Sequence, residues 1–228
     1  MIFVANYKMN GNKEFYLQVN KVFNKLKVKD TIVLCPPFVY MPFLKIKNKN
    51  VLLGSQDIAQ LENRKSTGQI GATMLNEIGV KYCLIGHSER REIGETDEMV
   101  ANKVCHAQEN NITPIVCVGE KTKTAKLDVV VEQVQIALSK AGNKEIIFAY
   151  EPVWAIGTGE QPSVKKIDKV IDLIKTTAIK QGFNVKVLYG GSVNLSNYTE
   201  VKKSKVDGFL MGGVSLKINE FMQIVKGE

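Results

Sequence analysis

The chain has 228 residues, of which 44% are hydrophobic, and its 31 basic and 23 acidic side chains give a formal net charge of +8. Such a chain is long enough to bury a sizeable core, as one large domain or two small ones. No apolar run reaches the length of a membrane-spanning helix, which excludes an integral membrane protein of that kind.

The basic excess would suit an anionic ligand or nucleic acid. The lysines, however, are scattered over loops and predicted helices, with no arginine-rich tract and no basic patch interleaved with aromatic residues. We therefore interpret the excess as a solvated, lysine-rich surface and predict no nucleic-acid partner.

The amino terminus and the cysteines both indicate a cytoplasmic protein. The first residues lack the basic region and the cleavage site of a signal peptide, so we expect them to form a strand. The four cysteines are spread along the chain without a C-x-x-C pair. This spacing argues against zinc sites and disulfides.

Eight short apolar runs rich in β-branched residues follow one another along the chain. They are near-continuous rather than alternating, as expected of parallel strands that are covered on both faces. The predicted strands are residues 2–5, 31–35, 51–55, 82–86, 113–118, 145–150, 185–190 and 207–212.

Segments with helical periodicity lie between most of these strands, most clearly at 15–26, 129–141 and 164–180. Eight strands and eight helical stretches in βαβα order predict right-handed crossovers, and so a doubly wound sheet or a closed (β/α)8 barrel. Eight repeats in a chain of this length favour the barrel. No linker or composition shift is present, so we predict one α/β domain over residues 1–228.

Chemistry in such a barrel lies where the strands end, and the first predicted strand is followed by ANYKMNG. This places Asn6 and Lys8 at the barrel mouth. A lysine there supplies a compact positive charge, which is useful against a phosphate or a developing oxyanion.

The fourth predicted strand is followed by GHSERRE, which puts His87 at a strand end. Ser88 is placed to cap the short helix that follows. The dipole of that helix disfavours a charged histidine, so we expect His87 to act as a neutral donor toward a carbonyl oxygen. The other histidine, His106, falls inside a predicted helix and is expected to be a packing or surface residue.

The sixth predicted strand is followed by EPVWAIGTG, so Glu151 lies directly at the barrel mouth. The loop after it is apolar, and it contains Gly157, Gly159 and the only tryptophan of the chain. An acid at the end of a buried strand is a candidate general base.

The last two strands are followed by glycine pairs, in YGGSV and MGGVSL. Adjacent glycines let backbone N–H groups approach a phosphate, and a helix that starts there adds its dipole. The residues concerned are Ser192, Gly212 and Gly213, each expected at the entry to a helix. Turns after the last two strands are also where barrels commonly bind phosphate.

One mouth thus collects a lysine, a neutral histidine, a glutamate and a phosphate site. The sequence shows no metal cluster, cofactor motif or nucleophilic cysteine beside them. A base next to a neutral electrophile suits proton abstraction beside a carbonyl. We predict an aldose–ketose isomerisation of a small phosphorylated substrate, without cofactor or metal.

The motifs NYKMN, GHSERR, YEPVWAIGTG, YGGSV and MGGVSL occur in this order, each at a predicted strand end. In this combination the chain resembles the triosephosphate isomerase family, from its first strand to its last helix. The resemblance implies a TIM barrel that interconverts dihydroxyacetone phosphate and D-glyceraldehyde 3-phosphate through an enediolate, in glycolysis and gluconeogenesis. It also implies that no cofactor is needed.

The resemblance implies roles for individual residues. Glu151 takes the proton beside the carbonyl and returns it to the neighbouring carbon, while an uncharged His87 polarises the carbonyl. Lys8, with Asn6 beside it, offsets negative charge, and Glu89 supports proton handling. The residues implied to bind the phosphate are Gly157, Ser192, Gly212 and Gly213.

The resemblance further implies a mobile lid that begins at Pro152 and excludes water from the enediolate. The lid ends in Glu160, Gln161 and Pro162, where the family usually has a lysine and small residues. Because proline fixes its backbone angle φ, we expect Pro162 to stiffen the closing hinge.

Three other positions depart from the family pattern. Tyr7 stands where tryptophan is usual, and Val214 replaces the usual alanine at the phosphate turn. The segment RKSTGQ (64–69) resembles the family's dimer loop but keeps only Thr67 and Gly68. We still expect a homodimer through the loop around Thr67, with altered polar contacts.

Alternatives remain open at this stage. Another phosphate-binding barrel isomerase or synthase would explain the barrel and the glycine pairs, though hardly GHSERR and YEPVW together. A basic barrel that binds nucleic acid would show binding that falls steeply with salt in a fluorescence-polarisation titration. An inactive paralogue is disfavoured, because every motif-matched catalytic position holds the expected residue type.

Overall fold

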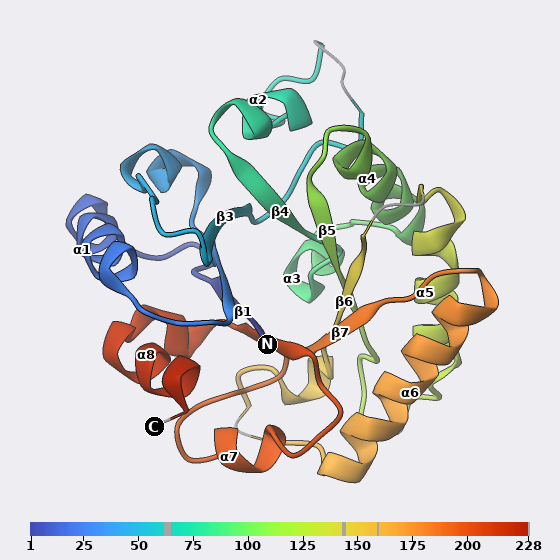
Figure 1. Cartoon of the computed structure of the whole chain (residues 1–228). Coiled ribbons are helices and arrows are strands. Elements are labelled where there is room, and N and C mark those ends of the chain that lie inside the picture. The colour runs from blue at the N-terminus through green and yellow to red at the C-terminus, as the bar shows by residue number, and fades with distance from the viewer. Residues whose placement is uncertain (62–64, 143–144, 159, 228) are drawn as a thin grey trace.

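The computed structural model describes residues 1–61, 65–142, 145–158 and 160–227. Its strands are all parallel and close into a barrel in chain order, with β8 paired to β1 (Figure 1). The predicted (β/α)8 barrel is thereby confirmed over the open doubly wound sheet. The strands are β1 (Ile2–Asn6), β2 (Thr31–Cys35), β3 (Val51–Ser55), β4 (Val80–Ile85), β5 (Thr113–Val118), β6 (Ile147–Tyr150), β7 (Lys186–Tyr189) and β8 (Gly208–Met211).

Helices surround the strands (Figure 1). The α-helices of the described ranges are α1 (Lys13–Lys25), α2 (Ala72–Glu77), α3 (Ser88–Glu92), α4 (Asp97–Glu109), α5 (Asp128–Ser139), α6 (Val164–Lys180), α7 (Tyr198–Val201) and α8 (Ile218–Lys226). Three short 3₁₀ helices are η1 (Phe38–Phe43), η2 (Val153–Ala155) and η3 (Gly213–Leu216).

A strict βαβα order would place one α-helix in each connection between strands, and the structure differs from this in two connections. The β2–β3 connection forms η1, with Pro42 inside it. Proline lacks the N–H that an α-helix needs, which disfavours a regular α-helix here. The β4–β5 connection instead contains both α3 and α4.

The strands are buried on both faces, which explains their near-continuous apolar sequences. One apolar cluster fills the barrel interior, and a larger one lies between the strands and the helices. Cys35 and Cys117 face the interior, and Cys83 belongs to the outer cluster. Burial raises the pKa of all three thiols, so they stay protonated and pack as small hydrophobes.

Cys35, Cys83, Cys105 and Cys117 are all free thiols. Within the ranges that the structure describes, no helix has the length and hydropathy to cross a membrane.

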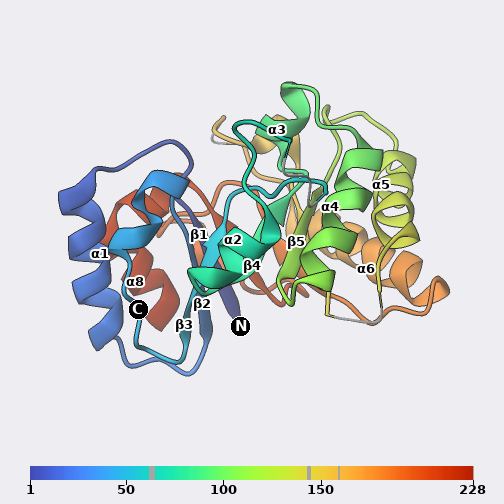
Figure 2. The same ribbon diagram turned by 90° about the horizontal axis from the view of Figure 1, so that it is seen from above.

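Because all strands run the same way, the residues that follow them gather at one end of the barrel. Helix α3, which follows β4, lies over that end, and Figure 2 shows it on the side opposite to the amino terminus. The predicted site residues come from the same end, after β1, β4, β6, β7 and β8.

Candidate active site

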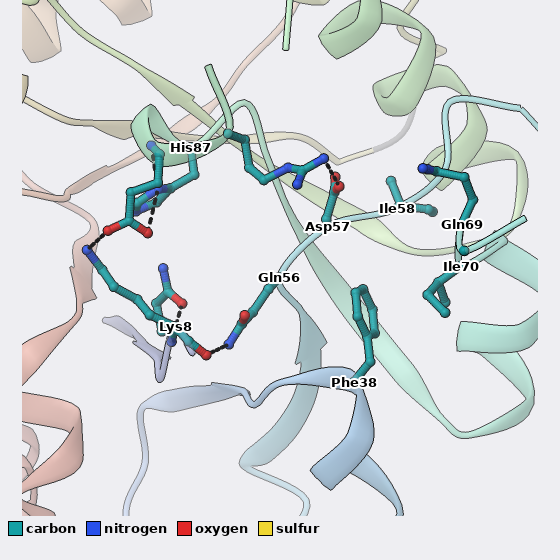
Figure 3. Close-up of a pocket in the computed structure, with 12 residues that line it drawn as sticks. Lys8, Phe38, Gln56, Asp57, Ile58, Gln69, Ile70 and His87 are labelled. Carbon is teal, nitrogen blue, oxygen red and sulfur yellow. Dashed lines mark hydrogen bonds and ion pairs between the residues drawn. The ribbon is translucent and has the colours of Figure 1, made fainter. Parts of the chain in front are cut away.

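The strand ends meet around a cavity of about 230 Å³. Of the nine predicted site residues, it is lined by Asn6, Lys8, His87, Glu151, Gly157, Ser192, Gly212 and Gly213. The ninth, Glu89, lines a neighbouring cavity of about 250 Å³ that shares Asn6, Lys8 and His87 with the first (Figure 3). The predicted residues are therefore brought together in space.

His87 is the last residue before α3 and caps that helix with its own side chain. Its Nδ1 accepts a hydrogen bond from the backbone N–H of Glu89 at 3.2 Å. A ring nitrogen that accepts a hydrogen bond carries no proton, so the proton of the neutral ring lies on Nε2. That nitrogen is 3.3 Å from Oε1 of Glu151.

The prediction that Ser88 caps α3 is wrong. Ser88 is the first residue of the helix, and its backbone N–H donates to Oε2 of Glu151 at 3.0 Å. The start of α3 thus uses one of its free N–H groups to hold the glutamate, while His87 satisfies another. Both side chains depend on this one short helix for their orientation.

Glu151 is buried, with only 2% of its surface exposed. Two glycines let the chain pass close to it. A Cβ on Gly119 would lie 1.8 Å from the carbonyl oxygen of Glu151, and one on Gly190 would lie 2.9 Å from its Cγ. The residues after β5 and β7 therefore pack closely against Glu151, with Gly119 against its backbone and Gly190 against its side chain.

Lys8 has an unusual backbone conformation, with φ at 51°, in the left-handed region that favours glycine. Asn6 accepts a hydrogen bond from its N–H at 3.0 Å, and Gln56 donates to its carbonyl oxygen at 2.8 Å. Its Nζ lies 2.5 Å from Oε1 of Glu89. Figure 3 shows this ammonium group held between the barrel mouth and α3.

The glycine turns flank the same cavity. Gly213 begins η3, for which the structure shows no side-chain cap among the described residues. A Cβ on Gly212 would lie 3.2 Å from Cε of Lys8, so this glycine lets the lysine lie against the turn. Val214 lines the cavity beside them.

The turn after β7 differs from the prediction, because no helix starts at Ser192. Helix α7 begins only at Tyr198. The side chain of Asn194 accepts hydrogen bonds from the N–H groups of Ser196 and Asn197, which forms a turn instead. The helix-dipole contribution expected at this turn is therefore absent, while Oγ of Ser192 accepts from the N–H of Gly157 at 3.3 Å.

The substitution at Tyr7 lies outside both cavities. Its ring packs edge-on against Phe15 and Tyr16, with centroid distances of 5.7 and 5.5 Å. Tyr7 therefore packs within an aromatic cluster next to the site and does not line it. His106, the second histidine, is buried within α4, as expected of a packing residue.

Sequence reasoning missed a buried carboxylate, Glu120, two residues beyond β5. It is fully buried, and its Oε1 accepts from the hydroxyl of Tyr150 and from Nε1 of Trp154, each at 3.0 Å. The ammonium group of Lys166 lies 2.9 Å from the same oxygen. The backbone carbonyl oxygen of Glu120 also accepts a hydrogen bond from the N–H of Val153 at 3.1 Å. Glu120 therefore anchors the segment directly after Glu151.

We expect Lys166→Met to lower the free energy of unfolding by about 3 kcal/mol, because it leaves the buried carboxylate of Glu120 without its counter-charge. Urea unfolding at fixed protein concentration measures the change. Lys165→Met is the matched control, since Lys165 is an exposed neighbour on the same helix. Equal losses in the two variants would contradict this account of Glu120.

The described residues contain no group of three or more histidine, cysteine, aspartate or glutamate side chains able to hold a metal ion. Of the residues named from the sequence, Arg64 and Gly159 lie outside the described ranges. The chemistry available in the cavity is that of a carboxylate, a neutral imidazole, an ammonium group and backbone N–H groups.

Comparison with known proteins places the chain in a family. The family model described as triosephosphate isomerase matches residues 1–228. The chain is 40% identical over 242 aligned positions to a triosephosphate isomerase of Thermoanaerobacter sp. (strain X514), covering 98% of each. It is 38% identical to that of Gloeothece citriformis, covering 99% of this chain and 98% of the relative. It is 36% identical to that of Buchnera aphidicola subsp. Cinara cedri, covering 99% and 97%. The chain therefore belongs to the triosephosphate isomerase family.

Proposed function

We propose that the chain interconverts dihydroxyacetone phosphate and D-glyceraldehyde 3-phosphate, with Glu151 as the base and His87 as the electrophile. The observation that carries these roles is the 3.3 Å approach of Glu151 Oε1 to His87 Nε2 in a cavity bordered by the glycine turns. A base and a proton-bearing donor side by side are what enolisation beside a carbonyl requires.

The resting arrangement must change when substrate binds. In the structure Nε2 of His87 lies next to Glu151. When substrate binds, its carbonyl oxygen accepts the Nε2–H of His87 in place of Glu151. Glu151 then leaves Ser88 and reaches the carbon beside the carbonyl. The C–H electron pair forms the new C=C bond, and the carbonyl π electrons move to the oxygen.

The reverse steps complete the isomerisation. Glu151 returns the proton to the neighbouring carbon, while Nε2 of His87 exchanges protons with the two oxygens. The ammonium group of Lys8 offsets the negative charge of the enediolate and of the phosphate. Glu89, which pairs with Lys8 and whose N–H holds Nδ1 of His87, keeps both groups aligned.

The phosphate group would bind where backbone N–H groups and Ser192 converge, at Gly157, Gly212 and Gly213. These residues line the same cavity as Glu151. The segment from Pro152 to Pro162 acts as a lid over them, since Glu151 precedes it directly and Gly157 lies within it.

A coupled assay, in which a dehydrogenase consumes the product, tests the proposed reaction in both directions. We expect fast turnover without added metal or cofactor. Absence of interconversion by the folded protein would overturn the proposal. A nucleic-acid role has no support in the site, and many surface lysines pair with carboxylates instead, as Lys205 does with Asp172 at 2.6 Å.

We further propose that the protein is a homodimer, in which the loop around Thr67 of one copy enters the 250 Å³ cavity beside Lys8 of the other. Exposed apolar side chains support this choice of surface. Met9 is 95% exposed and Val39 is 73% exposed, and each directly follows a residue that lines the cavity (Figure 3). Contiguous apolar surface typically marks an interface, and these two side chains each adjoin the lining of one cavity.

Gel filtration at micromolar concentration is expected to give a dimer. Met9→Asp places a charge in the apolar contact, so we expect it to weaken the dimer by at least about tenfold. Ile179→Asp is the control, because Ile179 is also exposed but lies on α6. A monomeric wild-type protein, or equal effects of the two variants, would contradict the proposed interface.

A further inference from the structure

Lys123, in the connection between β5 and α5, contacts both ends of the lid. Its Nζ lies 2.9 Å from Oε2 of Glu160, near the far end of the lid. The same ammonium group lies 5.3 Å from the ring centroid of Trp154, three residues after Glu151. Neither Lys123 nor Glu160 lines the catalytic cavity.

Trp154 is held by further contacts in this conformation. Its Nε1 donates to Glu120, and Nζ of Lys166 lies 4.8 Å from its ring centroid. Nζ of Lys166 also lies 3.5 Å from the carbonyl oxygen of Lys123. Both lysines therefore contact the ring that links the lid to the buried carboxylate.

These contacts belong to a resting conformation, in which Glu151 accepts from the N–H of Ser88 and Trp154 is bound to Glu120. Substrate binding has to move Glu151 away from Ser88. Between Glu151 and Trp154 lie only Pro152, with its fixed φ, and Val153 of the short η2. The base and the tryptophan therefore shift together, and the contacts of Trp154 oppose that shift.

We propose that Lys123 is a positioning residue that stabilises the resting conformation of the lid, through Trp154 at one end and Glu160 at the other. This inference rests on the proposed function of Glu151 and the lid. Lys123 itself lies outside the lid, so its contacts are lost when Trp154 and Glu160 move. By stabilising the resting lid, Lys123 lowers the affinity for ligands that require the lid to move.

The size of the bias follows from the exposure of the groups. The side chains of Lys123 and Glu160 are 69% and 55% exposed, so the ion pair is weak and is screened by salt. A cation–π contact at an exposed site adds a similar small amount. Together they should bias the lid equilibrium by about three- to fivefold.

Ligand affinities measure this bias. The first ligand is 2-phosphoglycolate, whose carboxylate mimics the enediolate and engages the moved base. The second is inorganic phosphate, which binds at Gly157 and the glycine turns but does not engage the base. Isothermal titration calorimetry measures both affinities. The ratio of the 2-phosphoglycolate affinity to the phosphate affinity isolates the cost of moving the base and, with it, Trp154.

We expect Lys123→Gln to raise this ratio about three- to fivefold, and Lys123→Arg to leave it at the wild-type value. Glu160→Gln should raise the ratio by less than Lys123→Gln does, because it removes only the ion pair. The double variant should have the same ratio as Lys123→Gln. Added salt screens the extra carboxylate of 2-phosphoglycolate in every variant, so the ratio should fall with salt less steeply in the wild type than in Lys123→Gln. Lys121→Gln is the control, since Lys121 lies in the same connection and makes no ion pair with a described residue.

An unchanged ratio in Lys123→Gln, or an equal rise in Lys121→Gln, would overturn the inference. These outcomes are distinct from a failure of the proposed function, which would appear as a wild-type protein without isomerase activity. An active wild type with an unchanged ratio refutes the role of Lys123 alone.

Discussion

Glu151→Gln is expected to lower kcat by about 10³- to 10⁴-fold, because the amide cannot accept the proton from the substrate carbon. Its carbonyl oxygen still accepts from the N–H of Ser88, and its shape still fits beside Gly190. The variant should therefore fold and bind inorganic phosphate with wild-type affinity. The coupled assay and a phosphate titration measure the two effects separately.

The matched control is Glu145→Gln, which changes a carboxylate two residues before β6 begins, whereas Glu151 directly follows β6. Glu145 pairs with Lys186 at 2.7 Å. Lys186 is the first residue of β7, so this pair lies at the end of the barrel opposite to the cavity. We expect its kcat to stay within about twofold of the wild type, as for a surface substitution. Undiminished activity in Glu151→Gln would remove Glu151 from the role of base.

The location of the site was predictable because strand ends are a local feature of the sequence. Near-continuous apolar runs indicate parallel strands buried on both faces, and the residue after each run must lie at the same end of the barrel. This reasoning is sufficient to place Lys8, His87 and Glu151 together. It needs no knowledge of which side chains touch.

The partners of those residues were not predictable from local pattern. Ser88 is a good helix cap by residue type, but its N–H is used by Glu151, which is 63 residues away in the chain. The ring of His87 takes the capping role instead. A choice of this kind depends on tertiary contacts, which outweigh the preference of a single residue.

Glu120 was missed for a related reason. It follows β5 in the sequence CVGEK and so occupies a strand end like the other site residues. Its role becomes visible only when Trp154 and Lys166, which lie 34 and 46 residues further along, are seen on the same carboxylate oxygen. A search for polar residues just beyond every one of the eight strands would have identified Glu120 as a candidate.

Lys8 offers a test that separates the contribution of its side chain to activity from the contribution of its backbone to stability. Its side chain supplies the positive charge of the cavity, while its backbone has the left-handed φ of 51°. An L-residue with a Cβ in this region costs about 1–2 kcal/mol, which glycine avoids. The Lys8 N–H donates to Asn6 and the Lys8 carbonyl oxygen accepts from Gln56, and these bonds hold the backbone there when the side chain is removed.

We expect Lys8→Ala and Lys8→Gly to lower kcat/KM alike, by about 10²- to 10³-fold, since both lose the charge that offsets the phosphate and the enediolate. Lys13→Ala, which removes a nearby charge outside the cavity, should change kcat/KM little. Comparable losses in Lys13→Ala would mean that the overall charge matters rather than the placement of Lys8.

The two Lys8 variants should nevertheless differ in stability. Lys8→Gly should unfold with a free energy about 0.5–1 kcal/mol higher than Lys8→Ala, because relief of the left-handed strain outweighs the extra freedom of glycine in the unfolded chain. Urea unfolding at one fixed protein concentration, which keeps any dimer contribution constant, measures the difference. If Lys8→Ala were the more stable of the two, the backbone at this position would not be strained. Lys8 would then owe its place at the mouth to its charge alone.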